Sequence, residues 1–212
     1  INSTFKSNRA LMGGGIYNSG TINDISTSIF EGNENSGLYN TGTITTVSAT
    51  FTDNSATNGG AIFNSKNIGT ITGEFTGNSA NVGGAIYNTG TITNLSNSTF
   101  ENNNGSAIYN TNSIGVITAN FTGNSSDTTG GAISNSGEIT SVINSTFSGN
   151  YSNTLGGAIS STGSIDSLNG TFTGNYSTSG GGAVNNSGSL TLSNSTFTGN
   201  YVLSTSDEAK GG

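Results

Sequence analysis

Two carboxylates are the residues of this sequence best placed for acid–base chemistry. Glu74 directly precedes Phe75, and Glu101 directly follows Phe100. If these phenylalanines stack on neighbouring strands, the two glutamates point outward as diagonal neighbours about 8 Å apart. That separation suits an inverting glycosidase, in which one carboxyl is the acid and the other activates water. We favour the simpler interpretation of two solvated charges, because no aromatic groove or substrate clamp accompanies them.

Other catalytic arrangements and metal sites find little support. The chain has no His and no Cys, which excludes Ser–His and Cys–His catalysis and thiol ligands. Aspartates are spread over different positions of the sequence, and the Gly-rich calcium-binding nonapeptides are absent. We therefore expect no enzyme activity, no metal and no cofactor.

The charge of the chain excludes one class of partner. The net charge is −7, and the only cations are Lys6, Arg9, Lys66 and Lys210. Such a chain offers no basic surface for phosphates, so we expect no nucleic acid partner. No apolar run approaches the ~20 residues of a membrane span, so we expect no direct membrane insertion.

Aromatic side chains are better candidates for a binding function. Two groups recur at fixed places in the sequence, and we take them as candidate ligand-binding residues: Tyr17, Tyr39, Phe63, Tyr87 and Tyr109 in one, and Tyr151, Tyr176 and Tyr201 in the other. Aromatic faces suit sugars and protein anchors. The alternative role is mutual stacking, which stabilises a sheet.

Phenylalanine sets the register of a repeat that runs through the chain. The pattern Phe-x-x-Asn recurs at near-regular intervals, at Phe5, Phe30, Phe51, Phe75, Phe100, Phe121, Phe147, Phe172 and Phe197. A second apolar anchor follows the first eight: Ile16, Leu38, Ile62, Ile86, Ile108, Ile133, Ile159 and Val184. A third comes six residues later, and a fourth usually three residues after that. Such units bury their few apolar side chains only by stacking on one another.

The repeat predicts an all-β fold, a right-handed parallel β-helix of about eight coils of 21–26 residues. Three apolar stations predict three strands and three turns per coil. Coils spaced about 4.8 Å apart give a rod of roughly 40 Å. Strand alternation puts the phenylalanines and the second anchors in the core, and the residue after each second anchor on the outside.

Two asparagine columns accompany these anchors. One contains the Asn of every Phe-x-x-Asn, and the other lies two residues after the second anchor, with Ser161 as its exception. Stacked amides can hydrogen-bond along the axis, and Asn tolerates left-handed turns, so we interpret both columns as structural.

The length of the repeat varies between the Phe and the second anchor. This segment is shortest from Phe30 to Leu38 and from Phe100 to Ile108, and it is longest in the last three units, as from Phe121 to Ile133. The spacing from the second to the third anchor never varies. We therefore expect a loop of variable size on one flank of the rod and a tight corner on another.

The predicted β-helix domain covers residues 1–203. The chain starts in mid-coil, since Ile1–Phe5 match Ile143–Phe147, and we expect it to be a fragment of a longer protein. Residues 204–212 leave the repeat and are expected to be a linker or a frayed end.

The alternation of Phe-x-x-Asn with Gly-Gly-Ala-Ile resembles the polymorphic outer-membrane proteins of chlamydiae and related autotransporter passengers. Matching pairs are Phe75–Asn78 with Gly83–Ile86, and Phe147–Asn150 with Gly156–Ile159. The resemblance covers the whole chain. It implies a secreted β-helical passenger that adheres to host cells or surfaces.

We expect a non-enzymatic, extracellular or cell-surface protein that serves as an adhesin or a structural rod. Its expected partners are a glycan or a protein on a host or neighbouring cell, with end-to-end or lateral self-association as a further option. Two alternatives stay open. One is a polysaccharide-degrading β-helix enzyme. The other is ice binding through Thr-x-Thr ranks around Phe51, Phe172 and Phe197, which Lys6 and Glu31 interrupt in other coils.

Overall fold

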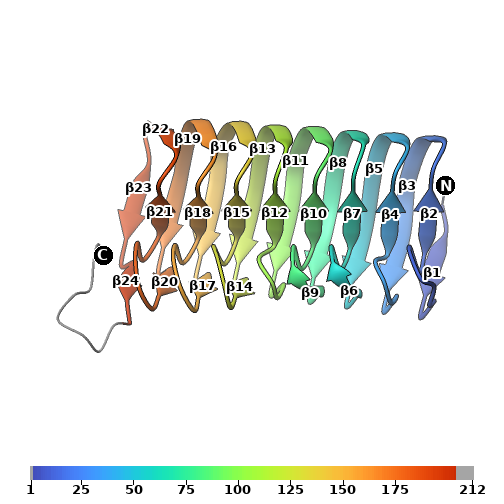
Figure 1. Cartoon of the computed structure of the whole chain (residues 1–212), viewed down its shortest axis with the longest axis horizontal. Coiled ribbons are helices and arrows are strands. Elements are labelled where there is room, and N and C mark those ends of the chain that lie inside the picture. Colours follow the sequence, from blue (N-terminus) through green and yellow to red (C-terminus); the bar gives the residue numbers. More distant parts are fainter. Residues whose placement is uncertain (1, 204–212) are drawn as a thin grey trace.

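The chain forms a rod of stacked coils, as the computed structural model shows for residues 2–203 (Figure 1). This described part contains 24 strands and no helix, and the strands pair in parallel. The predicted all-β parallel solenoid of about eight turns is confirmed. The expected linker or frayed end, residues 204–212, lies outside the described residues. We number the coils by the Phe that begins each one; coils 1 to 8 begin at Phe5, Phe30, Phe51, Phe75, Phe100, Phe121, Phe147 and Phe172.

Sheet 1 forms one long side of the rod, and most of its strands have ten or eleven residues. Its ten members are β1 (Thr4–Lys6), β3 (Thr21–Glu31), β5 (Thr43–Thr52), β8 (Asn67–Thr76), β11 (Thr91–Glu101), β13 (Ser113–Thr122), β16 (Glu138–Ser148), β19 (Ser164–Thr173), β22 (Ser189–Leu192) and β23 (Thr196–Thr198).

Sheet 2 lies on another side of the rod and consists of eight three-residue strands. They are β2 (Ile16–Asn18), β4 (Leu38–Asn40), β7 (Ile62–Asn64), β10 (Ile86–Asn88), β12 (Ile108–Asn110), β15 (Ile133–Asn135), β18 (Ile159–Ser161) and β21 (Val184–Asn186). Each pairs residue for residue with the same position of the next coil, so equivalent side chains stack along the axis.

The third side is formed by two separate small sheets. Sheet 3a joins β6 (Ser55–Asn58) and β9 (Ser79–Val82), and sheet 3b joins β14 (Ser125–Ser126), β17 (Tyr151–Ser152), β20 (Tyr176–Ser177) and β24 (Tyr201–Val202). In coils 1, 2 and 5 this side is reduced to single bridges at Arg9, Glu34 and Asn104.

The division of each coil into strands differs from the sequence prediction. Three apolar stations predicted three strands, but the third and fourth anchors lie on the same long strand as the following Phe; β5 carries Ile44, Val47 and Phe51. The third strand instead follows Phe-x-x-Asn and has no constant apolar residue. The predicted number of three strands holds for the coils with a strand on the third side, but the apolar stations are distributed differently over the strands, because the short link between the last anchor and the Phe contains no turn.

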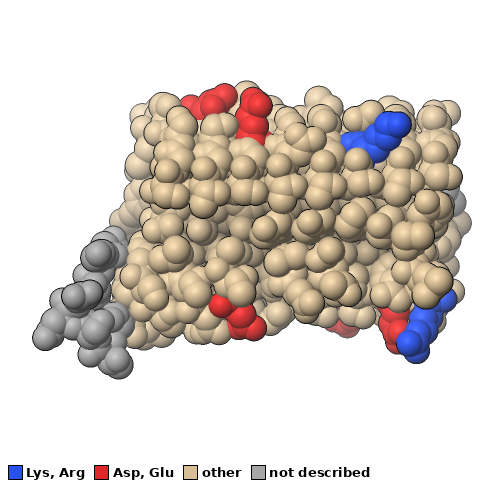
Figure 2. All heavy atoms as spheres, viewed as in Figure 1, with Lys and Arg blue, Asp and Glu red and all other residues tan. Residues whose placement is uncertain are grey.

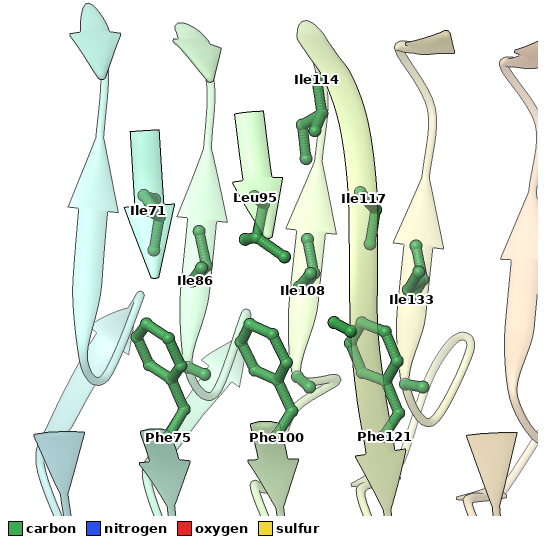
Figure 3. Close-up of a cluster of buried hydrophobic side chains, with 14 of the residues drawn as sticks. Ile71, Phe75, Ile86, Leu95, Phe100, Ile108, Ile114, Ile117, Phe121 and Ile133 are labelled. Atoms are coloured by element: carbon green, nitrogen blue, oxygen red, sulfur yellow. The ribbon is translucent and has the colours of Figure 1, made fainter. Parts of the chain in front are cut away.

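The core lies between sheets 1 and 2, and its residues are the predicted ones. The phenylalanines stack with ring centroids 4.6 to 5.0 Å apart, and Figure 3 shows Phe75, Phe100 and Phe121 beside the inward-facing aliphatic anchors. Every predicted core side chain is buried: Phe30, Phe51, Phe75, Phe100, Phe121, Phe147, Phe172, Ile62, Ile86, Ile133 and Ile159. Stacking on both sides leaves each interior ring no contact with water.

The asparagines of Phe-x-x-Asn form a buried hydrogen-bonded column, as predicted. Asn78 is typical: its Nδ2 and its backbone N–H both donate to Asn103 Oδ1, each at 3.0 Å, and its Nδ2 also donates to Phe51 O at 2.9 Å. No buried side-chain N or O of the described residues lacks a partner. The column therefore holds the corner of every coil, and hydrogen bonds compensate the burial of the asparagine amides.

The reason given for this column needs correction, because these asparagines are not left-handed. The residue before each of them has the positive φ, between 53° and 65°; Gly77 and Asp53 are examples. Glycine occupies this position in most coils, since it adopts φ > 0 without strain. The hydrogen bonds of the side-chain amide, and not tolerance of a left-handed backbone, therefore account for Asn at this position.

The second asparagine column holds the tight corner between sheets 2 and 1. Asn40 Oδ1 accepts from Gly42 N at 3.2 Å, and its Nδ2 donates to Asn64 Oδ1 at 2.8 Å. This turn accounts for the invariant spacing from the second to the third anchor. At Ser161 the hydroxyl replaces the amide and accepts from Asn135 Nδ2 at 3.1 Å.

Coil length varies in a second place that the sequence analysis missed. Coils 1, 4 and 6 carry one extra residue in sheet 1 before the next Phe, and Thr27, Asn97 and Asn144 take positive φ there. A serine holds each bulge: Ser98 Oγ donates to Ser96 O at 3.1 Å and accepts from Gly73 N at 3.2 Å. The hydroxyl thus satisfies the amide that the register shift would leave unpaired.

Candidate binding face

The first aromatic group forms a continuous ladder on sheet 2. Its members are Tyr17, Tyr39, Phe63, Tyr87 and Tyr109, which pair in register from coil to coil. Their ring centroids are 4.2 to 5.8 Å apart and their planes lie within 25° of parallel. Strand alternation therefore brings these five side chains together, as the sequence predicted. Tyr17 is 48% exposed, and the other four are half-buried.

Mutual stacking determines which part of each ring a partner can reach. Phe63 lies between Tyr39, at 4.2 Å, and Tyr87, at 5.3 Å. Both faces of an interior ring are thus covered by neighbouring rings, and only its edge points to solvent. A sugar that binds by stacking needs a free ring face. The ladder instead offers a row of edges and tyrosine hydroxyls.

The ladder is partly desolvated around Tyr39. Burial, and then the nearby Tyr17 hydroxyl, raise the pKa of Tyr39 above its ordinary value. The Thr41 hydroxyl lies 3.4 Å from the Tyr17 hydroxyl, at the outer edge of the same corner.

The ladder ends at coil 6 for a reason that the sequence did not reveal. Ser134 and Ser160 occupy its next two positions, which alternation predicted to be exposed, but they retain only 7% and 8% exposure. The loop before sheet 2 is longer in coils 6 to 8 than in any of coils 1 to 5. It passes close to this column, since a Cβ on Gly180 would lie 3.6 Å from Asn185 Oδ1. The ladder therefore ends where the loops become longer and the outer column becomes nearly buried.

The second aromatic group forms a shorter ladder on sheet 3b. Tyr151 and Tyr176 stack at 4.6 Å, and Tyr176 and Tyr201 stack at 5.2 Å. Tyr201 is 44% exposed, while the other two are half-buried. The two ladders therefore lie on different sides of the rod and in different coils.

The two candidate carboxylates are placed as predicted but do not share a site. Glu74 pairs with Thr99 and Glu101 with Thr76, which makes them diagonal neighbours on sheet 1. Glu74 lines a shallow depression of about 460 Å³ between the bulges at Thr27 and Asn97, and Glu101 does not line it. This depression brings one carboxylate, and not a pair, to a ligand.

Bulges also interrupt the threonine ranks on sheet 1. The depression between Thr27 and Asn97 has Ala49 and Gly73 in its floor, and a second one, of about 300 Å³, lies between Asn97 and Asn144. The outer face of sheet 1 is therefore stepped along the axis instead of flat.

Charges are sparse on this surface. Figure 2 shows only a few charged side chains on the face in view. Two exposed ion pairs, Lys6–Glu31 at 2.8 Å and Arg9–Glu34 at 3.0 Å, join coil 1 to coil 2. No group of three or more acidic side chains that could hold a metal ion occurs among residues 2–203. Within the same residues, no helix is long and apolar enough to cross a membrane.

Comparison with protein families finds a similarity in four segments of the chain. The sequence model of the Chlamydia polymorphic membrane protein (Chlamydia_PMP) repeat matches residues 48–65, 72–89, 118–136 and 144–162. These four segments of the chain are similar to that repeat. No curated protein and no solved structure matches it.

Each matched polymorphic membrane protein repeat covers the same part of a coil. It starts near the end of a sheet 1 strand, includes the Phe and the buried Asn, crosses the third side and ends at the sheet 2 strand. The matched segments contain Phe51, Phe75, Phe121 and Phe147, so they cover coils 3, 4, 6 and 7. None of these coils has the short loop that distinguishes coils 2 and 5.

The short coil 2 creates a feature that the sequence analysis did not recognise. Between its flanking loops lies a hollow of about 180 Å³, bordered by Met12 of coil 1, Tyr39 of coil 2, and Ala56 and Phe63 of coil 3. The short spacing after Phe30 was the available signal, because a loop with fewer residues cannot extend as far from the rod axis as the longer loops beside it.

Proposed function

We propose that this chain is part of a non-enzymatic surface protein of autotransporter-passenger type, and that it acts as an adhesin. The observation that carries the proposal is the combination of polymorphic membrane protein repeats with an outward aromatic ladder on a rigid rod. The rod holds the ladder in place, and its partner is a glycan or a protein on a host or neighbouring cell.

Tyrosine suits this role because it offers a large contact area at low cost in side-chain entropy, with a hydroxyl that can bond to the partner. The four tyrosines of the ladder recur at coil spacing along one side. A repeating partner surface can therefore be contacted at several coils at once, which raises overall binding strength.

The test replaces three tyrosines of the ladder together. Tyr39, Tyr87 and Tyr109 are changed to Ser, the residue that the protein itself has at positions 134 and 160. We expect a folded rod whose stability falls by about 1 kcal/mol per lost cross-strand pair, and a sharp loss of binding to cells. The matched control changes Tyr151 and Tyr176 to Ser on the second ladder. Full cell binding by the folded triple variant would contradict the proposed binding face.

The two alternative functions receive less support. A stepped sheet 1 cannot match a flat ice plane over many coils, so we expect no ice shaping at micromolar protein. A glycosidase needs two carboxyls at one substrate, whereas the depression on sheet 1 brings only Glu74. We expect no turnover on a panel of polysaccharides, and activity abolished by Glu74→Gln would reverse this ranking.

A further inference from the structure

The depression that Glu74 lines on the outer face of sheet 1 is bounded by two bulged strands. Strands β5 and β8, side by side in Figure 1, pair without interruption, whereas β3 and β11 each carry an additional residue before the Phe. The additional residues, Thr27 and Asn97, are exposed and border the depression on either side. All four strands pair with a neighbour on both sides. The depression is therefore produced by strand register in the interior of the rod.

Uncharged polar side chains line this depression and are not used to hold the fold. Four of them make no hydrogen bond to any other of the described residues: Ser48, Thr50, Thr72 and Asn97. In the second depression, by contrast, Asn120 Oδ1 already accepts from Thr146 Oγ1 at 2.7 Å. The first depression thus presents several donors and acceptors that a ligand can use.

One carboxylate and no cation complete the lining. Glu74 is exposed and takes no part in the two ion pairs of the described residues, and no Lys or Arg lines the depression. A carboxylate only accepts hydrogen bonds, and a hydroxyl group gives it a charge-assisted one. An anionic ligand would meet a like charge without a compensating cation. The lining therefore favours a neutral ligand that is rich in hydroxyl groups.

The same depression also offers carbon surface. Ile29 is 43% exposed and is paired with Thr4 on one side and Thr50 on the other. Ala49 lies in the floor. A sugar ring has hydroxyl groups at its rim and C–H groups on its faces, so it meets both kinds of surface. An apolar ligand would leave Glu74 and the free hydroxyls without partners, and an ammonium group would use Glu74 alone, in an exposed ion pair of little strength.

The size of the depression limits the length of its ligand. Its volume of about 460 Å³ falls within the roughly 300–1,000 Å³ that is typical of small-molecule sites. Thr27 and Asn97 lie three coils apart, which corresponds to about 14 Å along the axis at the usual strand spacing. The space between these two bulges therefore accommodates a short stretch of a glycan, and not a long chain that runs along the rod.

We infer that the sheet 1 depression binds a short neutral glycan without cleaving it. Glu74 and the free hydroxyls of Thr50 and Thr72 bond to sugar hydroxyls, and Ile29 contacts a ring face. The inference goes beyond the proposed adhesin site, because the depression lies on sheet 1 and the aromatic ladder on sheet 2. Cleavage does not follow, since a glycosidase needs a second carboxyl at the same sugar.

A glycan array tests the class of ligand. It is probed with the whole chain and carries neutral oligosaccharides beside matched acidic ones that contain uronic or sialic acid. We expect binding to neutral glycans, and binding about ten-fold weaker to their acidic counterparts because of Glu74. No binding to any glycan overturns the proposal, and binding confined to acidic glycans overturns the assigned chemistry.

Two matched charge variants test the location. Glu74→Gln removes the charge inside the depression, whereas Glu101→Gln removes the same charge from its diagonal neighbour, which does not line it. We expect Glu74→Gln to lose about ten-fold in affinity for the best neutral glycan and to gain affinity for acidic ones, with Glu101→Gln unchanged. Equal affinities in the two variants overturn the assignment. Far-UV circular dichroism checks that both variants fold.

Removal of the free hydroxyls tests the remaining contacts. Thr50→Val combined with Thr72→Val keeps nearly the same side-chain shape, and Thr171→Val combined with Thr196→Val is the control, at paired positions of sheet 1 that do not line the depression. We expect the first pair to lose about ten-fold in affinity for the same neutral glycan and the control to bind like the unmodified chain. Unchanged binding by the first pair would show that these hydroxyls do not contact the sugar and would overturn the site.

The ladder variant separates this inference from the adhesin proposal. Replacement of Tyr39, Tyr87 and Tyr109 by Ser is expected to leave binding to the array intact. Loss of that binding in the folded variant assigns glycan recognition to the ladder and overturns the depression. If the whole chain binds cells but Glu74→Gln binds the array as well as Glu101→Gln does, the adhesin proposal stands and this inference fails. If the chain binds neutral glycans through the depression but does not bind cells, the inference stands and the adhesin proposal fails.

Discussion

Coils 1 to 5 and coils 6 to 8 share one core but present different surfaces. In the first five coils, sheet 2 carries the ladder from Tyr17 to Tyr109. In coils 6 and 7 the same positions are Ser134 and Ser160, nearly covered, and the aromatic residues move to sheet 3b, beginning at Tyr151. The buried Phe stack continues through both regions at the same spacing.

The difference shows how a small change in loop length selects an outer side chain. The loop that leads from Phe121 to Ile133 in coil 6 has one residue more than the loop from Phe75 to Ile86 in coil 4. The longer loop occurs together with a nearly buried outer position, since Ser134 is only 7% exposed. Core and surface are therefore specified separately. The apolar anchors determine how the coils stack, and the length of the loop determines which side chains lie on the outer face of sheet 2.

The largest loss of stability is expected for a substitution in the core, where the two regions are identical. Phe121→Asp places a charge between Phe100 and Phe147, which are both buried. An unpaired buried charge costs several kcal/mol, so the rod should unfold or open at coil 6. Thermal unfolding monitored by circular dichroism measures this. The control Thr122→Asp changes an exposed neighbour, and an equal melting temperature in both variants would contradict the internal Phe stack.

The next effect concerns the asparagine column that also crosses both regions. Asn124→Ala removes the acceptor of two donors, Asn103 N at 3.0 Å and Asn103 Nδ2 at 2.9 Å. Each orphaned buried group costs about 1–3 kcal/mol, so a loss of about 3 kcal/mol is expected in urea unfolding. Asn120→Ala, at an exposed position of sheet 1, is the control. A loss as small as that of the control would mean that water replaces the amide.

A smaller effect should appear at the boundary between the regions. Ser134→Tyr extends the ladder by one ring into a column that the longer loop covers, so overpacking should cost about 1–3 kcal/mol in thermal or urea unfolding. Deletion of Asp127 in the same variant shortens this loop to the length that it has in coil 4, and should restore most of the stability. If the deletion restores nothing, loop length does not decide where the ladder ends.

The smallest effect is a pH dependence of stability that comes from Tyr39, in the first region. The pKa of Tyr39 is raised by burial and by Tyr17, so the folded state favours the neutral phenol. This contribution to stability is complete below the pKa of an unfolded tyrosine, about 10, and is lost as the pH rises through the folded pKa. Absorbance titration at high pH should show a late-titrating tyrosine that disappears in Tyr39→Phe. The same titration in Tyr151→Phe is expected to keep it.

The sequence by itself determined the stacking of this protein. Nine repeats of Phe-x-x-Asn and the invariant spacing between the second and third anchors define a solenoid, its core and both asparagine columns. They do so because parallel in-register coils place identical residues on one another, so a linear period becomes a column of contacts. The aromatic ladder from Tyr17 to Tyr109 follows from the same rule and strand alternation.

Other features depend on how each chain segment bends around the stack of phenylalanines, and only the tertiary structure determined them. A short link kept Phe51 on one strand with Val47, and a serine hydroxyl made the bulge at Asn97 possible. The covering of Ser134 and the hollow beside Tyr39 arise from length differences between neighbouring coils. Spacing shows that such differences exist, but where the chain places added or missing residues depends on packing against adjacent coils, which no single repeat encodes.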